Sequence, residues 1–244
     1  MRTSLIVQKA CGRYTQITWA IQSIVLGIVN IVRLGNLADM RYCTIIPCKE
    51  HSVGLPGKNF KKLGGQSLFV WSITYSLQEG YFPIVSTDNV ELVKAHIPLA
   101  ISKRVEVMHR VVDESTTLSI LKPVFEKYED LERAALLQPT SPFRARGKLR
   151  EMMARGHSIT TDRIKGVGYW DGEFVEQQRR QDATKWFDHY DGNILVTERA
   201  DILTGKVFNE PVPYPEPFPM THEIDEPDDF EWAQIILKKH LNDA

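Results

Sequence analysis

The stretch YCTIIPCKEHSVGLPGKN, residues 42–59, decides the fold class of this 244-residue chain. It opens with the nearly continuous, β-branched run CTII at 43–46, which is typical of a strand buried on both faces of a parallel sheet. We expect this strand to stop at Pro47. The Gly- and Pro-containing sequence after it predicts a tightly bent loop at the end of the strand.

The loop contains the groups that a phosphate site needs. Ser52 and the flanking residues Lys49, Lys58 and Asn59 lie among glycines that allow the backbone to approach an anion. The spacing does not fit a P-loop, because Gly57-Lys58 is followed by Asn59 instead of Ser or Thr. A surface turn with solvated lysines is the alternative interpretation, and the residues alone leave both open.

The composition is that of a globular protein with 43% hydrophobic residues and a formal net charge of −1. This suits one α/β core, alone or with a small appendage. Near-neutral charge argues against nucleic-acid binding over the whole surface, since neutralising many phosphates requires a basic field. Cys11, Cys43 and Cys48 are too few and too irregular for a disulfide framework or a zinc site, which favours a reducing cytoplasm.

The first 39 residues differ from the rest of the chain. The segment 17–32 is mostly apolar; it is short for a membrane span, which needs about 20 residues, but long enough for a signal-type hydrophobic region. An extra helix, a membrane anchor and sequence upstream of a later true start are the alternatives. Because Met40 stands just before the strand, we favour an unessential or misassigned leader over 1–39, one domain over 40–244 and no stable membrane association.

A β-α-β unit is expected after the loop. The sequence predicts a turn over 61–65, a helix over 66–78 that Gly80 ends, and a second strand over 83–88. Two parallel strands require such a crossover, and ligands of open α/β sheets gather outside the carboxyl ends of the strands. The polar residues 86–88 are therefore expected at the same sheet edge as the loop.

The same arrangement recurs twice further along the chain. A third strand is expected over 105–108 with Arg110 just after it, and a fourth over 135–137 with Gln138 and a Pro-Thr-Ser-Pro turn after it. Three such placements in register predict a single site along the carboxyl edge of the sheet.

The remaining elements complete the fold and add a hairpin arm. Asp-Gly at 171–172 supplies the positive φ angles of a tight turn, so Tyr169–Phe174 predicts a hairpin within an arm over about 163–190. The arm either packs on its own core or, as we favour, takes part in dimerisation. The other expected elements are a helix through Tyr128 capped by Asp113 or Ser115, a helix over 148–155, strands over 158–162 and 193–197, an extended or turning loop over 210–219 and a helix beginning near Pro227.

Two carboxylates precede the last helix. Glu223 and Asp225 lie on one face if their segment is extended. Hard oxygen ligands of this kind suit Mg²⁺ bound to a nucleotide. Helix capping is the alternative role for Asp225, whereas Glu223 has no such alternative, so the pair is a candidate magnesium site.

The order of these motifs resembles that of the acylneuraminate cytidylyltransferases, also called CMP-sialic acid synthetases. The resemblance rests on IIPCKEHSVGLPGKN, IVSTD, VEVMHR, LLQPTSPFR and HEIDEPDDFEWA, and it covers roughly residues 42–237. It implies a Rossmann-like, mostly parallel sheet with helices on both faces, a homodimer and a need for Mg²⁺. The implied reaction is the transfer of CMP from CTP to the anomeric hydroxyl of a nonulosonic (sialic-type) acid, with release of pyrophosphate.

The resemblance also assigns roles in nucleotide binding. Lys49 falls where the family usually has an arginine, and Ser52 and Lys58 match phosphate-binding groups. Asn59 matches a cytidine-contacting asparagine, and Arg110 aligns with an arginine near the cytosine. These five residues are the predicted nucleotide-binding set.

Residues later in the chain would hold the sugar and the metal. Gln138 aligns with a glutamine facing the sugar, and Arg180 resembles an arginine that reaches the sugar acid. Glu223 and Asp225 fall on paired metal-binding aspartates. We expect Lys58 and Asp225 to be catalytic, because positioning and electrostatics carry most of an in-line attack on the α-phosphorus.

Three departures from the family pattern leave other functions open. Val53 stands in place of a second lysine, which could forfeit about 1.5–3 kcal/mol of phosphate binding. Glu223 replaces an aspartate, and the segment 187–192 lacks the Arg and Asn that the family carries before Gly. The alternatives are a Kdo-type or other sugar nucleotidyltransferase, and a catalytically impaired CTP-binding homologue that acts as a regulatory subunit.

Overall fold

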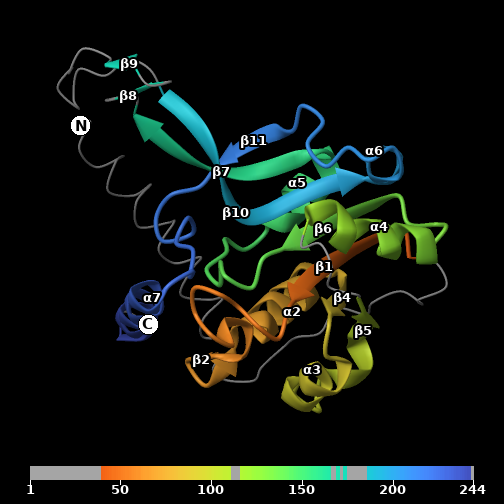
Figure 1. Ribbon diagram of the computed structural model, residues 1–244, viewed down its shortest axis with the longest axis horizontal. Coiled ribbons are helices and arrows are strands. Elements are labelled where there is room, and N and C mark those ends of the chain that lie inside the picture. The colour runs from red at the N-terminus through yellow and green to blue at the C-terminus, as the bar shows by residue number, and fades with distance from the viewer. Residues whose placement is uncertain (1–39, 111–115, 166–168, 171–172, 175–185, 243–244) are drawn as a thin grey trace, which may run out of the picture.

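The computed structural model describes residues 40–110, 116–165, 169–170, 173–174 and 186–242 (Figure 1). The expected leader over 1–39 lies outside these ranges, as do Arg180 and much of the expected arm. Within the described ranges, no helix is long and apolar enough to cross a membrane.

A seven-stranded sheet forms the centre of the molecule, in the order β11-β7-β10-β6-β1-β4-β5. Four strands, β6, β1, β4 and β5, are mutually parallel; β10 runs antiparallel to β6 and β7, and β11 is parallel to β7. The predicted mostly parallel α/β sheet is therefore confirmed. The strands are β1 (Tyr42–Cys48), β4 (Phe82–Thr87), β5 (Glu106–His109), β6 (Arg133–Leu137), β7 (Ser158–Lys165), β10 (Trp186–Glu198) and β11 (Val212–Pro215).

Strand β1 is central and buried on both faces, as its sequence predicts. Cys43 and Ile45 belong to one core cluster, whereas Ile46 and Cys48 belong to the cluster on the opposite face. The expected stop at Pro47 is wrong, because β1 continues to Cys48, which pairs with Thr87 of β4. A proline removes only its own N–H donor, and the pairing resumes at the next residue.

Helices cover both faces of the sheet. On one face lie α2 (Leu68–Glu79), α3 (Val90–His96) and α5 (Lys148–Arg155), whose apolar residues share a core cluster. On the other lie α4 (Thr117–Lys127) and α6 (Arg199–Leu203). This division is expected of right-handed crossovers, since the chain moves outward from β1 to β5 and then returns across the sheet to β6. The predicted two-sided packing is confirmed.

The helix ends show where local sequence decides the structure. Gly80 ends α2 in the left-handed conformation, with φ of 89°, as predicted. Helix α4 begins after Thr116, whose Oγ1 accepts a hydrogen bond of 3.2 Å from the Ser119 N–H. This corrects the expected cap at Asp113 or Ser115, both of which lie outside the described residues.

The last helix, α7 (Pro227–Asn242), packs on the start of α2 and forms a third core cluster. Ala233, Ile236 and Leu237 are buried, and Phe230 is partly buried. In Figure 1, α7 lies on the side of the molecule toward which β1 points.

Two smaller features involve the turns and the sheet edge. The segment 210–219 contains β11, an edge strand whose prolines are tolerated because an edge position needs fewer backbone donors. The hairpin predicted at Tyr169–Phe174 is confirmed by the antiparallel pairing of β8 (Tyr169–Trp170) with β9 (Glu173–Phe174). Cys43 and Cys48 are buried and free.

Candidate functional site

The candidate site lies where the order of the parallel strands reverses. From β1 the chain adds β4 and β5 on one side, then returns to place β6 on the other. A crevice forms at such a switch point, outside the carboxyl ends of the strands. The loop after β1 and the segment after β6, which begins at Gln138, flank this point.

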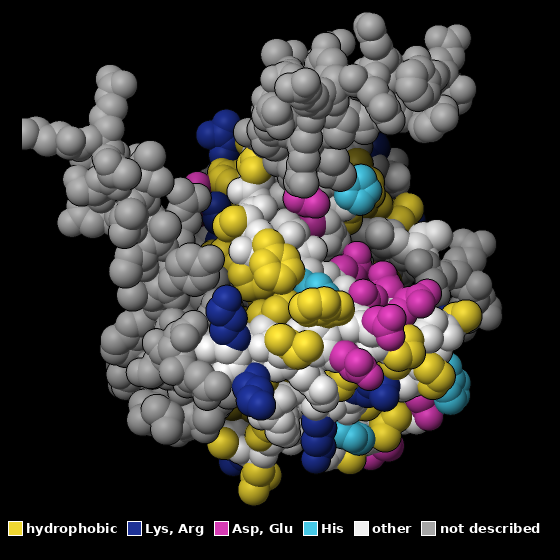
Figure 2. All heavy atoms as spheres, turned by 90° about the vertical axis from the view of Figure 1, so that its left-hand side faces the viewer, with side chains coloured by type: hydrophobic (Ala, Val, Ile, Leu, Met, Phe, Trp, Pro, Cys, Tyr) yellow, Lys and Arg dark blue, Asp and Glu magenta, His cyan; other side chains and the backbone are white. Residues whose placement is uncertain are grey.

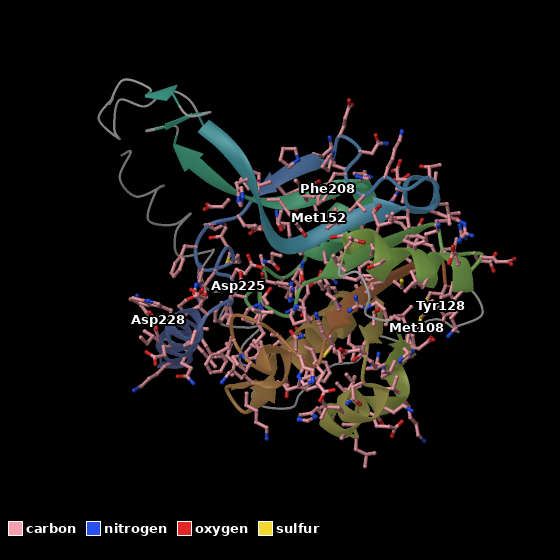
Figure 3. The ribbon with its side chains drawn as sticks, viewed as in Figure 1. Met108, Tyr128, Met152, Phe208, Asp225 and Asp228 are labelled. Carbon is pink, nitrogen blue, oxygen red and sulfur yellow. The ribbon has the colours of Figure 1, made fainter. Side chains whose placement is uncertain are left out.

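The loop after β1 contacts the segment that carries the two candidate metal ligands. The Lys58 ammonium lies 2.5 Å from Oδ1 of Asp225, 167 positions away in the sequence. A Cβ atom on Gly54 would lie 2.7 Å from the backbone oxygen of Asp225, so a glycine is required for this approach. Asp225 is labelled in Figure 3, in the stretch leading to α7. The structure thus brings the two predicted catalytic residues together.

A short turn fixes the shape of this loop. Gly57 adopts φ of 63° and starts the 3₁₀ helix η2 (Lys58–Phe60). The Asn59 side chain, which is 6% exposed, donates a 2.9 Å hydrogen bond from Nδ2 to the Lys49 carbonyl. Asn59 therefore braces the loop.

Glu223 is held beside Asp225 by the segment that follows β6. Thr140 donates from Oγ1 to Glu223 Oε1 at 3.2 Å, and the Ile224 N–H donates to the Thr140 carbonyl at 2.8 Å. Burial, followed by the charge of Asp225, raises the pKa of Glu223. Gly192 packs so closely that a Cβ there would lie 3.0 Å from Glu223 Oε1. Two close carboxylates in this setting favour a bound cation.

Arg110 lies at the same edge, just beyond β5. Its N–H donates to the Thr87 carbonyl at 2.7 Å, and the residue is only 7% exposed. Burial lowers the pKa of its guanidinium, and the charge of Asp88 opposes this effect. Its Nε and Nη1 make no hydrogen bond to any residue that the structure describes. A buried cation with unused donors can bind a polar group of a ligand.

Gln138 is positioned by a buried arginine that the sequence reasoning missed. Arg144 donates from Nη2 to the Gln138 carbonyl at 2.6 Å and from Nη1 to Ser72 Oγ at 3.1 Å. It is 4% exposed, and burial lowers its pKa to about 10. The sequence signal that could have identified Arg144 was its position at the end of LLQPTSPFR, where a charged residue follows two prolines.

Asp191 was also missed as a site residue, because its segment was considered only as a departure from the family pattern. Its Oδ1 accepts hydrogen bonds from Thr160 Oγ1 at 2.5 Å and from the Asn193 N–H at 3.0 Å. These bonds form the turn at Gly192 that packs on Glu223. Burial raises the pKa of Asp191.

The structure shows fewer contacts for the remaining residues that the sequence predicted for the site. The side chains of Lys49 and Ser52 are partly buried in the loop, and Val53 is fully exposed at 101%. Arg180 lies outside the described residues. The structure therefore groups Lys58, Glu223 and Asp225 directly and places the remaining predicted residues on adjoining segments.

A divalent cation fits the residues present, although the described residues contain no group of three or more His, Cys, Asp and Glu side chains that could hold a metal. Glu223 and Asp225 offer hard carboxylate oxygens, and Mg²⁺ commonly uses one or two carboxylates, with waters and substrate phosphates completing its shell. The face on the α7 side also has acidic side chains gathered in one area (Figure 2). The negative charge of this area favours the binding of cations.

Comparison with known proteins found no matching family model. The chain is 30% identical to the N-acylneuraminate cytidylyltransferase of Streptococcus agalactiae over 129 residues, 51% of this chain and 31% of that protein. It is 34% identical to that of Escherichia coli over 106 residues, 24% of that protein. It is 25% identical to the CMP-N,N'-diacetyllegionaminic acid synthase of Legionella pneumophila over 83% of this chain and 98% of that protein. The chain thus spans about a third of the length of the Streptococcus relative, and the resemblance inferred from the motifs is confirmed.

Solved structures support the fold. The structure of CMP:2-keto-3-deoxy-manno-octonic acid synthetase complexed with CTP has a TM-score of 0.63 and 14% identity, over 82% of this chain and 100% of that chain. The 4-diphosphocytidyl-2C-methyl-D-erythritol synthase of Anaerococcus prevotii has a TM-score of 0.58 and 11% identity, over 84% and 100%. The Rossmann-like architecture is therefore shared with both.

Proposed function

We propose that this protein is a cytidylyltransferase that uses CTP to activate a nonulosonic, sialic-type acid, giving the CMP-sugar and pyrophosphate. The observation that carries the proposal is the contact between Lys58 and Asp225, which joins the phosphate loop to the acidic segment. The similarity to N-acylneuraminate and diacetyllegionaminic acid enzymes supports the substrate class.

The reaction follows from the charges at the sheet edge. The anomeric hydroxyl of the sugar attacks the α-phosphorus in line; its oxygen bonds to phosphorus as the bond to the bridging oxygen breaks, and pyrophosphate leaves. Lys58, with Lys49 and Ser52, binds the triphosphate and meets the charge that develops on the leaving group. The hydroxyl proton passes to solvent, since no side chain is assigned as base.

The surrounding residues orient the two substrates. Arg110 binds the cytosine with its unused guanidinium donors, and Asn59 contacts the cytidine. Gln138 faces the sugar acid, and Arg180 pairs with its carboxylate. Effective positioning of the hydroxyl and the phosphorus supplies a large part of the rate enhancement.

Mg²⁺ is proposed as the cofactor, held by Glu223 and Asp225. When bound, it would neutralise phosphate charge and so favour departure of pyrophosphate. Asp225, whose Oδ1 contacts the Lys58 ammonium, would supply the second carboxylate to the cation. The hydrogen bond from Thr140 keeps one Glu223 oxygen in place.

Further parts of the proposal concern assembly and location. We infer a homodimer that uses the arm over about 163–190, a domain over 40–244, and a cytoplasmic location. The free, buried Cys43 and Cys48 are consistent with a reducing compartment.

The decisive test is a substrate panel. Purified protein is incubated with CTP, Mg²⁺ and a set of nonulosonic acids, with Kdo as a further arm, while pyrophosphate release is followed. Release with a sialic-type acid is expected. Release with Kdo alone would support the Kdo-type alternative, and no release with any acid would contradict the enzymatic proposal.

One observation favours the second candidate, a CTP-binding subunit with impaired catalysis. Val53 is fully exposed in the phosphate loop, where the resemblance expects a lysine. In that case the protein binds CTP without turnover, and Val53→Lys restores pyrophosphate release. Turnover by the unmodified chain would rule this candidate out.

A further inference from the structure

Helix α7 has a second apolar face, on the side away from the core. Trp232 and Ile235 are 58% and 56% exposed and lie about one turn apart. The buried residues Ala233 and Leu237 lie on the opposite side of the helix, because successive residues are rotated by about 100°. A surface helix ordinarily carries polar residues opposite its core-facing side. Two large apolar side chains at adjacent turns of the outer side therefore indicate a contact surface.

One charged residue flanks this apolar pair on each side. Asp228 lies four positions before Trp232, and Lys239 lies four positions after Ile235; both charged residues are exposed. All four side chains start within about 60° of one another around the helix axis. We call these four residues the outer stripe of α7. In Figure 1, α7 lies at the outside of the molecule, away from the central sheet, so another chain can approach this stripe.

The outer stripe is complementary to a second copy of itself. Its residues are spaced by four, three and four positions, so the spacing is the same in either direction. In an antiparallel pair related by a two-fold axis, Trp232 faces the partner's Ile235 and Asp228 faces the partner's Lys239. A parallel pair would place like charges opposite each other. The helix dipoles also favour the antiparallel arrangement, because opposite ends then lie close together.

We propose that the outer stripe of α7 binds the outer stripe of a second copy of this chain, with the two helices antiparallel. Such a two-fold contact uses the same surface on both copies. Trp232 and Ile235 supply the apolar centre, and the charges at the two ends fix the orientation. This surface is separate from the arm over about 163–190. The inference does not rest on the cytidylyltransferase proposal, because it uses no residue of that site.

The size of the stripe sets the expected strength of the contact. A standard stable interface contains about 20–30 residues from each partner. The outer stripe contributes far fewer, and exposed ion pairs add little energy in water. The association should therefore be weak, depend on protein concentration and weaken at high salt.

Sedimentation velocity of the full-length protein at increasing concentration tests the proposal. We expect the mean mass to rise with concentration. Asp228→Lys and Lys239→Asp should each require a severalfold higher concentration for the same rise, because each places like charges at both ends of the pair. Asp130→Lys and Lys238→Asp make the same charge changes at exposed positions outside the stripe and should have little effect.

Mixing the two single variants gives a sharper test. In a mixed pair, the introduced lysine faces the introduced aspartate, and the unchanged Lys239 faces the unchanged Asp228. An equimolar mixture of Asp228→Lys and Lys239→Asp should therefore associate as the wild type does, although neither variant does so alone. The double variant should also recover association. Damage to the fold of either variant would not be repaired by mixing.

The apolar centre is tested separately. Trp232→Gln should reduce association severalfold without changing the denaturant midpoint of unfolding, since the side chain is largely exposed. No rise in mass of the wild type with concentration would overturn the proposal. Equal losses in Asp130→Lys, or no recovery in the mixture and the double variant, would do so as well.

Discussion

Lys58 is 17% exposed at its side chain and contacts a carboxylate that is 58% exposed. A surface ion pair of this kind contributes little to folding. Its value is positional, because the ammonium is held at the sheet edge. The contact is thus expected to matter for activity much more than for stability.

Lys58→Met should lower kcat/KM for CTP by about 10²–10³-fold, the range seen when one group that stabilises transition-state charge is removed. Steady-state pyrophosphate release measures this. Lys61→Met is the matched control and should retain activity, because its ammonium lies over the Phe230 ring. Similar losses in both variants would show that only general loop charge matters.

Asp191 is a carboxylate whose pKa is raised by burial from its usual value near 3.8. The folded state then binds this proton more tightly than the unfolded state, so its contribution to stability falls as pH rises through the interval above 3.8. Asp191→Asn can keep both accepted hydrogen bonds through its Oδ1 and removes the buried charge. We expect it to unfold at higher denaturant concentration than the wild type at pH 7, with the difference shrinking near pH 4.

Urea unfolding at several pH values measures this effect. Asp130→Asn, at an exposed position, is the control and should leave the pH profile unchanged. A variant Asp191→Asn with lower stability than the wild type at every pH would contradict the prediction and would show that the charge is needed beside buried Arg144.

At the scale of elements, sequence patterns predicted the helices and strands whose formation depends on residues that are close together in the chain. The β1 run, the Gly80 stop of α2 and the 148–155 helix all reflect local chemistry, and the structure has them. The short helices α3 and α6 were missed because they contain few turns of periodic sequence. Strand β11 was missed because a proline-rich segment forms a strand only when an edge is available for pairing.

The same distinction explains the site residues that were missed. Arg144, Thr140 and Asp191 act through contacts with residues 31–83 positions away in the sequence. No local pattern encodes such contacts. Lys58 and Asp225 were found from local patterns, a loop that follows a strand and two carboxylates that precede the last helix, and the order of the motifs then gave them their expected roles.

Helix α7 supports the acidic segment through its buried face. Leu237 is 4% exposed and packs so close to Gly64 that a Cβ there would lie 2.6 Å from the Leu237 side chain. Leu237→Ala should therefore destabilise the protein by about 2–5 kcal/mol. Ile235→Ala, two positions away and 56% exposed, should change stability little. Denaturant midpoints compare the two variants, and equal losses would contradict the assigned packing.

At the scale of the whole molecule, the distribution of charge around the candidate site favours a bound cation. A triphosphate would lie between a loop with few ammonium groups and a pair of carboxylates, one of which has a raised pKa from burial and its neighbour. Like charges this close repel each other unless a cation is present. The proposed reaction should depend strongly on divalent metal.

Removal of metal with EDTA should abolish pyrophosphate release, and excess Mg²⁺ should restore it. Glu223→Gln should raise the Mg²⁺ concentration needed for half-maximal activity, because one of the two hard ligands loses its charge. Binding of Mn²⁺ measured without nucleotide provides an independent readout. Full activity in EDTA would contradict the assignment of Glu223 and Asp225.

The long strand β10 pairs with β7 in two separate parts. Its pairing with β7 covers Trp186 to Tyr190 and resumes at Leu195, with a register shift between them. The outer and inner halves are therefore separate pairing units, joined at the turn that packs on Glu223. A change of register in the outer half can end at this irregularity, so the inner half keeps its pairing with Ile159 and Ser158 of β7.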